Sequence, residues 1–167
     1  MPELPGELVS LRTLEVADVP RLRELRPRGW SPGDDWPLEG SAATRYTILL
    51  DRSIVGFIQS NENPDPEYRH ASIDIFVGTP YHGQGIGTDA VRTLAVHLAR
   101  DLGHHRVVID PRADNAAAIR CYCKVGFKPV GVMRRYERNL ETGEWNDALL
   151  MDLLAEDLDI SRAALRD

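Results

Sequence analysis

Cysteine is scarce in this chain of 167 residues, which contains only Cys121 and Cys123. Two cysteines one residue apart cannot build a disulfide framework or a metal cluster. The sequence also lacks the run of roughly 20 apolar residues that a membrane-spanning helix needs. Its first 12 residues lack the basic segment and apolar core of a secretion signal. These absences exclude a disulfide-rich secreted scaffold and a membrane-spanning helix, and we expect a cytoplasmic protein.

Positive charge is in deficit, because 20 lysine and arginine residues face 26 aspartate and glutamate residues, a formal charge of −6. Nucleic-acid binding draws most of its affinity from a basic surface, so this balance argues against it. A cationic or neutral partner fits the balance better than a nucleic acid, but on composition alone simple solubility is the preferred explanation. The hydrophobic fraction of 43% and the charged fraction of 28% are typical of a globular protein.

Hydrophobic patterning predicts strands and helices along a single domain, residues 1–167. The predicted strands cover residues 7–12, 46–50, 54–59, 72–77, 106–110, 128–136 and 145–153. The predicted helices follow Asp18, cover 88–102 and 115–125, and form a frayed tail from 156. Asp18 and Asn115 are expected to cap their helices, and a tight turn at 51–53 is expected to make a hairpin. This order of elements indicates an α+β fold with a mixed sheet.

A glycine-rich loop directly precedes the second helix, with glycines at 83, 85 and 87. Without Cβ atoms the backbone can turn sharply, so that its N–H groups converge on an anion. The positive end of the following helix adds to that attraction, and a pyrophosphate is the natural ligand. Ordinary turns also use such glycines. The spacing differs from the dinucleotide-binding fingerprint, and the lysine of a nucleotide P-loop is missing.

The loop resembles the acetyl-CoA loop of the GNAT superfamily of N-acetyltransferases, which reads Gln/Arg-x-x-Gly-x-Gly/Ala. Gly85 and Gly87 match its second half, whereas His82 stands where Gln or Arg is usual. The superfamily's second signature is a strand, an asparagine, and a helix with a tyrosine and a closing Gly-Phe. It is matched by residues 107–110, Asn115, Tyr122 and 126–127.

This resemblance covers nearly the whole chain and implies a fold. The expected GNAT fold is α+β, with a mixed, mostly antiparallel central sheet of about seven strands flanked by about four helices. It also implies acetyl-CoA as the co-substrate. The residues expected to bind acetyl-CoA follow the strand into the loop and the helices: Phe76, Val77, His82, Gly83, Gln84, Gly85, Ile86, Gly87, Thr88, Asn115 and Tyr122. Asn115 would contact the pantetheine arm, cap its helix, or do both.

A narrower resemblance is to the aminoglycoside 6'-N-acetyltransferases. Residues 110–127 are similar to the corresponding stretch of those resistance enzymes, and Asp74 matches an acidic residue that they use near the reacting amine. The similarity is concentrated in the second half of the chain. It implies a cationic amine substrate such as an aminoglycoside, and a monomer or homodimer.

Acetyl transfer from a thioester requires a group that handles the amine proton and a group that protonates the leaving thiolate. The resemblance implies that Asp74 has the first role and Tyr122 the second. A solvent-facing strand position is the alternative for Asp74, and a packed core tyrosine is the alternative for Tyr122.

Acidic residues supply the expected substrate contacts. The resemblance implies that Asp110 contacts a substrate ammonium, with a turn carboxylate before Pro111 as the alternative. Asp34 and Asp35 lie in an acidic loop that would present a negative wall to a polyamine, or would simply be solvated. The Trp30 side chain would pack against a sugar ring of the substrate, or would pack in the core.

Three functions remain open at this point. The preferred one is acetyl transfer from acetyl-CoA to the 6'-amino group of an aminoglycoside. The second is acetylation of a protein N-terminus or of a small metabolite amine by the same residues. The third is a non-catalytic acyl-CoA-binding module, against which the presence of both Asp74 and Tyr122 argues. No metal is expected, since His104 and His105 have no partner at ligand spacing.

Overall fold

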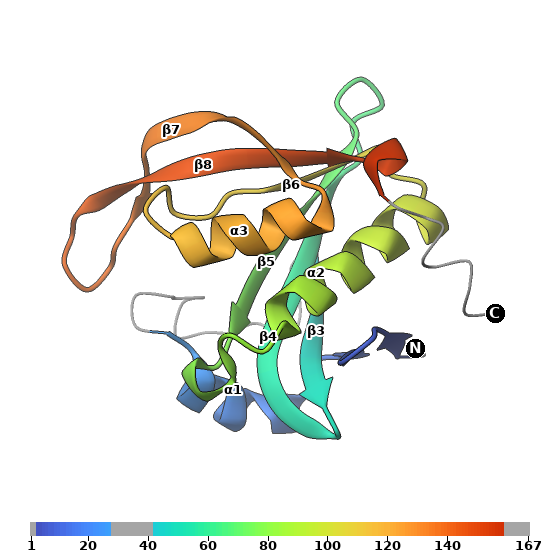
Figure 1. Ribbon diagram of the computed structural model, residues 1–167, viewed down its shortest axis with the longest axis vertical. Helices are drawn as coiled ribbons and strands as arrows, with labels where there is room; N and C mark the ends of the chain where they lie inside the picture. Colours follow the sequence, from blue (N-terminus) through green and yellow to red (C-terminus); the bar gives the residue numbers. More distant parts are fainter. Residues whose placement is uncertain (1–2, 28–41, 159–167) are drawn as a thin grey trace.

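The computed structural model describes residues 3–27 and 42–158, whose strands form one eight-stranded sheet (Figure 1). The strands are β1 (Leu4–Pro5), β2 (Ser10–Thr13), β3 (Ala43–Leu50), β4 (Ser53–Asn63), β5 (His70–Val77), β6 (Arg106–Ile109), β7 (Lys128–Arg138) and β8 (Trp145–Leu154). Their spatial order is β1-β2-β3-β4-β5-β6-β8-β7. Neighbours β5 and β6 are parallel and the other neighbouring pairs are antiparallel, so the predicted mixed, mostly antiparallel sheet is confirmed.

Within the described ranges the α-helices are α1 (Val19–Leu25), α2 (Ile86–Val96) and α3 (Ala116–Val125). The expected numbers, about seven strands and about four helices, are therefore each wrong by one for this part of the chain. The additional strand is β1, whose two residues are too few to show alternation. The predicted tail from residue 156 lies mostly outside the described residues, and its first two residues belong to a 3-10 turn, Ala155–Asp157. None of the helices formed by residues 3–27 and 42–158 is long and apolar enough to cross a membrane.

Local signals predicted the β3–β4 hairpin and both ends of α3 correctly. Asp51 and Arg52 turn the hairpin with positive φ angles of 48° and 68°, as a two-residue turn between antiparallel strands requires. The Asn115 side chain caps α3 by accepting a hydrogen bond of 3.2 Å from the Ala118 N–H. Gly126 ends the helix with a φ of 124°.

The helices cover both faces of the sheet. Helices α2 and α3 pack on one face in the main core, to which Leu94, Val125 and the buried β5 residue Ile73 all belong. Helix α1 packs on the other face in a smaller core, which consists of Leu22, Leu25, Phe57 and Phe76. Successive β5 side chains therefore point to opposite faces of the sheet, and both faces are buried near the end of the strand. Asp74 and Phe76 lie on the same face, and α1 covers that face at Phe76.

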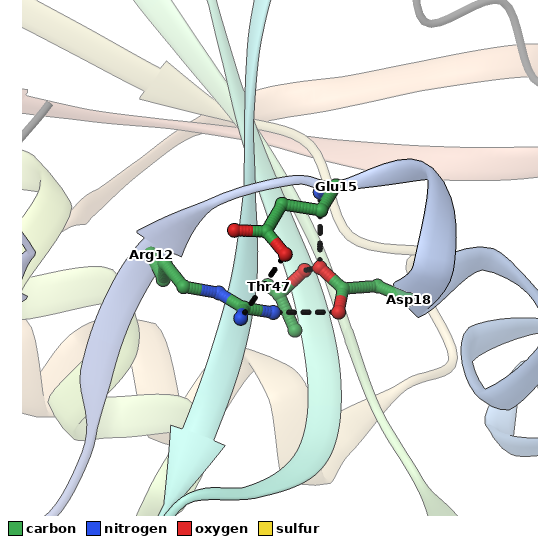
Figure 2. Close-up of polar contacts among 4 residues, drawn as sticks. All are labelled: Arg12, Glu15, Asp18 and Thr47. Carbon is green, nitrogen blue, oxygen red and sulfur yellow. Dashed lines mark hydrogen bonds and ion pairs between the residues drawn. The ribbon is translucent and has the colours of Figure 1, made fainter.

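Asp18 occupies the N-cap position of α1, as predicted, but its side chain makes no capping hydrogen bond to that helix. Its buried carboxylate instead joins β2, β3 and the turn before the helix (Figure 2). It accepts hydrogen bonds from the Glu15 N–H at 3.0 Å, from the Thr47 hydroxyl at 2.7 Å and from the Arg12 guanidinium. Burial alone would raise the pKa of Asp18, but these bonds outweigh it and hold the pKa below the usual 3.8. The carboxylate therefore remains charged and fixes this corner of the fold.

The first long strand begins at Ser10 rather than at residue 7, because residues 7–9 bind a side chain from α2 instead of a neighbouring strand. The Asp89 carboxylate accepts the N–H groups of Glu7, Leu8 and Val9 at 3.0, 2.7 and 2.9 Å. These partners lie about 80 residues apart in the sequence, so no local pattern could predict the contact.

The sheet opens between β5 and β6. Their parallel pairing is confined to Ala71 with Val107 and Ser72 with Val108, although β5 continues to Val77. In Figure 1, β6, β8 and β7 run across one end of the molecule while β3 and β4 run away from it. The loop that follows β5 and the end of β6 therefore face a gap in the sheet, which is where a ligand can enter an open sheet.

Candidate active site

A cavity of about 910 Å³ lies at this opening, lined by residues of β5, β6, α2, α3 and β7. The predicted site residues that line it are Asp74, Phe76, Val77, His82, Gly83, Gly85, Ile86, Gly87, Thr88, Asp110, Asn115 and Tyr122. Gln84 is not among the lining residues. Trp30, Asp34 and Asp35 lie outside the described residues. The sequence motifs, far apart along the chain, thus converge on one cavity.

The glycine loop presents its backbone to the cavity. Gly83 and Gly85 have left-handed φ angles of 74° and 79°, and Gly85 is the N-cap of α2. The His82 Nε2 lies 2.7 Å from the Val77 carbonyl, and because a carbonyl only accepts, this nitrogen carries the hydrogen. The Gln84 amide likewise donates to the Pro80 carbonyl at 3.3 Å. Both side chains therefore brace the loop, and the first N–H groups of α2 have no partner inside their own helix.

The loop conformation predicts a strong effect of Gly85→Val on acetyl-CoA binding. An added Cβ would lie 3.5 Å from the Leu8 Cδ1, an ordinary contact, so the cost arises from the backbone rather than from crowding. A β-branched residue at a φ of 79° is strained, and its methyl groups would enter the space of the anion. We expect the acetyl-CoA dissociation constant to rise about ten-fold or more, measured by calorimetry.

Gly103→Val is the matched control, since Gly103 also has a positive φ, 73°, but does not line the cavity. It should lose thermal stability and retain acetyl-CoA affinity. If Gly85→Val and the parent bind acetyl-CoA with equal affinity, the glycine loop is not part of the acetyl-CoA site.

Helix α3 brings Tyr122 to the cavity wall from within the main core. Its side chain is 8% exposed, and its ring meets the Phe127 ring edge-on at 6.3 Å. Burial, followed by the nearby Cys121, Asp74 and Asp110, raises the pKa of Tyr122 above its usual value of 10.0. The hydroxyl is therefore protonated throughout the neutral range and acts as a hydrogen-bond donor.

Asp74 and Asp110 form an acidic pair at the opening. Both line the cavity, and each lies two residues beyond the last parallel pair of β5 and β6, Ser72 with Val108. Burial and then the charge of Asp74 raise the pKa of Asp110 from 3.8 to about 6, and a hydrogen bond from Tyr136 moderates the rise. A carboxyl group whose charged form is disfavoured in this way makes a site that a bound cation would stabilise.

The sequence analysis missed Tyr136 and Glu137, which also line the cavity. They lie on β7, where the pairing with β8 shifts register between Met133 and Glu137 and Arg135 has a φ of 48°. The Asp147 carboxylate fixes this irregularity by accepting the Arg135 N–H at 2.8 Å. Such bulges redirect side chains, and no local sequence motif predicts this one.

Most of the basic lining residues lie on α3. Arg120 and Lys124 lie on α3 and Arg112 lies between β6 and α3, whereas the acidic lining residues lie on or directly after β5, β6 and β7. The cavity therefore has acidic groups on the strands and basic groups on α3 and in the segment before it. A ligand pair with an anionic and a cationic member matches this division.

Comparisons with known proteins agree with this arrangement. Residues 11–127 match the Acetyltransferase (GNAT) family. N-alpha-acetyltransferase RimI of Mycobacterium tuberculosis is 30% identical over 141 residues, 79% of this chain and 86% of that protein. Aminoglycoside N(6')-acetyltransferase type 1 of Klebsiella pneumoniae is 32% identical over 108 residues, 58% of this chain and 53% of that protein. This chain thus spans about half the length of that relative, and 38% of another.

Among solved structures, Mycobacterium smegmatis RimJ in complex with CoA-disulfide superposes with a TM-score of 0.80 at 22% identity. The match covers 98% of this chain and 93% of that one, so the two chains share a fold. The segment that matches the family runs from β2 through the glycine loop and α3 to Phe127. On this evidence the chain belongs to the acetyltransferase (GNAT) family.

Proposed function

We propose that this protein transfers the acetyl group of acetyl-CoA to a primary amine of a cationic substrate, with the 6'-amino group of aminoglycosides as the first candidate. The observation that carries this proposal is the acidic pair Asp74 and Asp110, which lies in the same cavity as the glycine loop. The loop and the basic groups suit the phosphates of acetyl-CoA. The acidic groups suit an ammonium group.

The reaction requires the amine nitrogen to lose a proton and attack the thioester carbonyl carbon. Asp74 accepts that proton directly or through water, and Asp110 holds a substrate ammonium. The attacking nitrogen then loses its second proton to solvent, the C–S bond breaks, and the Tyr122 hydroxyl donates a hydrogen bond to the departing sulfur. Beyond Ser72, β5 has no ladder to β6, so backbone N–H groups on that edge are candidate donors to the oxyanion.

Acetylation of a protein N-terminus is the second candidate. The likeness to RimI supports it, since that match covers 86% of the relative, against 53% for the aminoglycoside enzyme. The acidic lining favours the first candidate, because Asp74, Asp110 and Glu137 together suit a substrate with several ammonium groups. A peptide N-terminus offers a single ammonium group at the reacting end.

A thiol-release assay with acetyl-CoA distinguishes the candidates. The panel pairs aminoglycosides bearing a 6'-amino group with analogues bearing a 6'-hydroxyl, and adds peptides with free N-termini and linear polyamines. We expect turnover with the 6'-amino compounds and none with their 6'-hydroxyl analogues. Turnover of peptides alone would overturn the aminoglycoside proposal in favour of the second candidate. Hydrolysis of acetyl-CoA without any acceptor preference would argue against both.

Asp110→Asn tests the contact to the substrate cation, because it keeps the size of the side chain and removes its charge. A hydrogen bond between charged groups contributes about 1.5–3 kcal/mol, so KM for aminoglycosides should rise about ten-fold or more at pH 8. Only the ionised carboxyl holds the cation, and its pKa lies at about 6. The parent's KM should therefore rise as the pH falls through this value, and the gap to the variant should close by about pH 5.

Steady-state kinetics across this pH range provide the measurement, with acetyl-CoA affinity as the internal control. If the KM of the variant matches that of the parent at pH 8, Asp110 does not contact the substrate cation.

A further inference from the structure

A row of three polar side chains crosses the face of the sheet that carries Asp74. Arg45 on β3 pairs in register with Gln59 on β4, and Gln59 pairs in register with Asp74 on β5. The side chains are hydrogen-bonded in the same order. The Arg45 Nε donates to the Gln59 Oε1 at 3.3 Å, and the Gln59 Nε2 donates to the Asp74 Oδ2 at 3.0 Å.

The chemistry of the row fixes the orientation of the Gln59 amide. A guanidinium has only donors and a carboxylate has only acceptors, so a glutamine between them satisfies both in one orientation. Its oxygen faces Arg45 and its nitrogen faces Asp74. If the Gln59 amide were flipped, its NH₂ group would face the Arg45 guanidinium, which also only donates. Its oxygen would face the Asp74 carboxylate, which also only accepts. Arg45 thereby ensures that Gln59 donates a hydrogen bond to Asp74.

This bond determines how Asp74 faces the cavity. The terminal torsion of an aspartate is broad, so an unheld carboxylate samples many orientations. Gln59 occupies the Oδ2 atom, which leaves Oδ1 for a substrate. An ionised Asp110 cannot perform this task, because a carboxylate has only acceptors and carries charge of the same sign.

We propose that Gln59 is a positioning residue for the acetyl transfer reaction and holds the Asp74 carboxylate in its productive orientation. This inference rests on the proposed role of Asp74. Gln59 does not line the cavity, so it acts through Asp74 and not on the substrate. Arg45 supports it by selecting the orientation of the amide.

Gln59→Leu tests the inference, because leucine is similar in size and donates no hydrogen bond. We expect kcat/KM for the amine to fall about ten-fold, the effect of losing a hydrogen bond to a charged group, with acetyl-CoA affinity unchanged. Asn61→Leu is the matched control, since Asn61 is a partly buried amide two residues further along the same face of β4 and lies opposite Ser72. It should retain the parent's kinetics.

A double-mutant cycle separates positioning from a general structural effect. If Gln59 acts through Asp74, Gln59→Leu should cause no further loss of kcat/KM in the Asp74→Asn background. An additive ten-fold loss in that background would overturn the inference. If Asp74→Asn alone leaves the kinetics unchanged, the proposed role of Asp74 fails instead. Equal kinetics of Gln59→Leu and the parent, with Asp74→Asn impaired, would refute the positioning role and leave the proposed function intact.

Discussion

Tyr122→Phe is expected to lower kcat about 10²-fold while leaving acetyl-CoA binding and thermal stability nearly unchanged. The substitution removes one hydroxyl from a side chain whose ring is buried against Phe127. Phenylalanine keeps that ring contact, so the packing of α3 on the sheet should survive. What is lost is the hydroxyl of a residue that lines the cavity.

The pKa of Tyr122 explains why a value near 10² is expected, the lower end of the range for a positioned acid. Burial and the neighbouring Cys121, Asp74 and Asp110 raise this pKa, whereas a thiol of the cysteine type has a pKa of about 8.5. Complete proton transfer from the phenol to the thiolate is therefore uphill. In the proposed reaction the hydroxyl would stabilise the developing charge on sulfur by a hydrogen bond, and solvent would supply the proton that finally remains there.

Single-turnover kinetics and calorimetry with acetyl-CoA separate the two roles of Tyr122. Tyr46→Phe is the matched control, because Tyr46 is also a buried core tyrosine but does not line the cavity. It should retain kcat. If Tyr122→Phe instead loses thermal stability and keeps kcat, Tyr122 is a core residue and not a catalytic one.

Sequence reasoning succeeded where a feature depends on neighbouring residues. The β3–β4 turn, the Asn115 cap and the glycine loop before α2 each need only a few consecutive side chains, and each forms where the pattern predicted. It failed where a side chain is claimed by a distant segment. Asp18 has the residue type of a helix cap, yet Thr47 and Arg12 take its carboxylate.

The candidate site follows the same division. Asp74 and Asp110 could be singled out separately from resemblance, but their pairing depends on the parallel register of β5 and β6, which no local pattern encodes. Gln59 and Tyr136 carry no motif at all. They reach Asp74 and Asp110 through an antiparallel register and a bulge, both set by pairing between strands.

Asp74→Asn should reduce kcat and not only raise the KM for the amine, in contrast to Asp110→Asn. The asparagine keeps the shape of the side chain but accepts no proton, so the amine must reach the thioester already neutral. A general base contributes about 10²–10⁴-fold, and we expect a loss of this order at pH 7. The loss should appear with acetyl-CoA saturating, because Asp74 lies within β5 and not among the glycine-loop backbone groups.

The pH dependence of this loss distinguishes proton transfer from simple attraction. An alkyl ammonium of the lysine type has a pKa of about 10.4, so its neutral fraction rises about ten-fold for each pH unit between 7 and 9. If Asp74 removes the proton, the higher pH supplies neutral amine to the variant and the gap between variant and parent in kcat/KM should narrow. If Asp74 only attracts the cation, raising the pH supplies no missing function. A gap that stays constant or widens from pH 7 to pH 9 would therefore assign Asp74 to substrate binding and exclude it as the base.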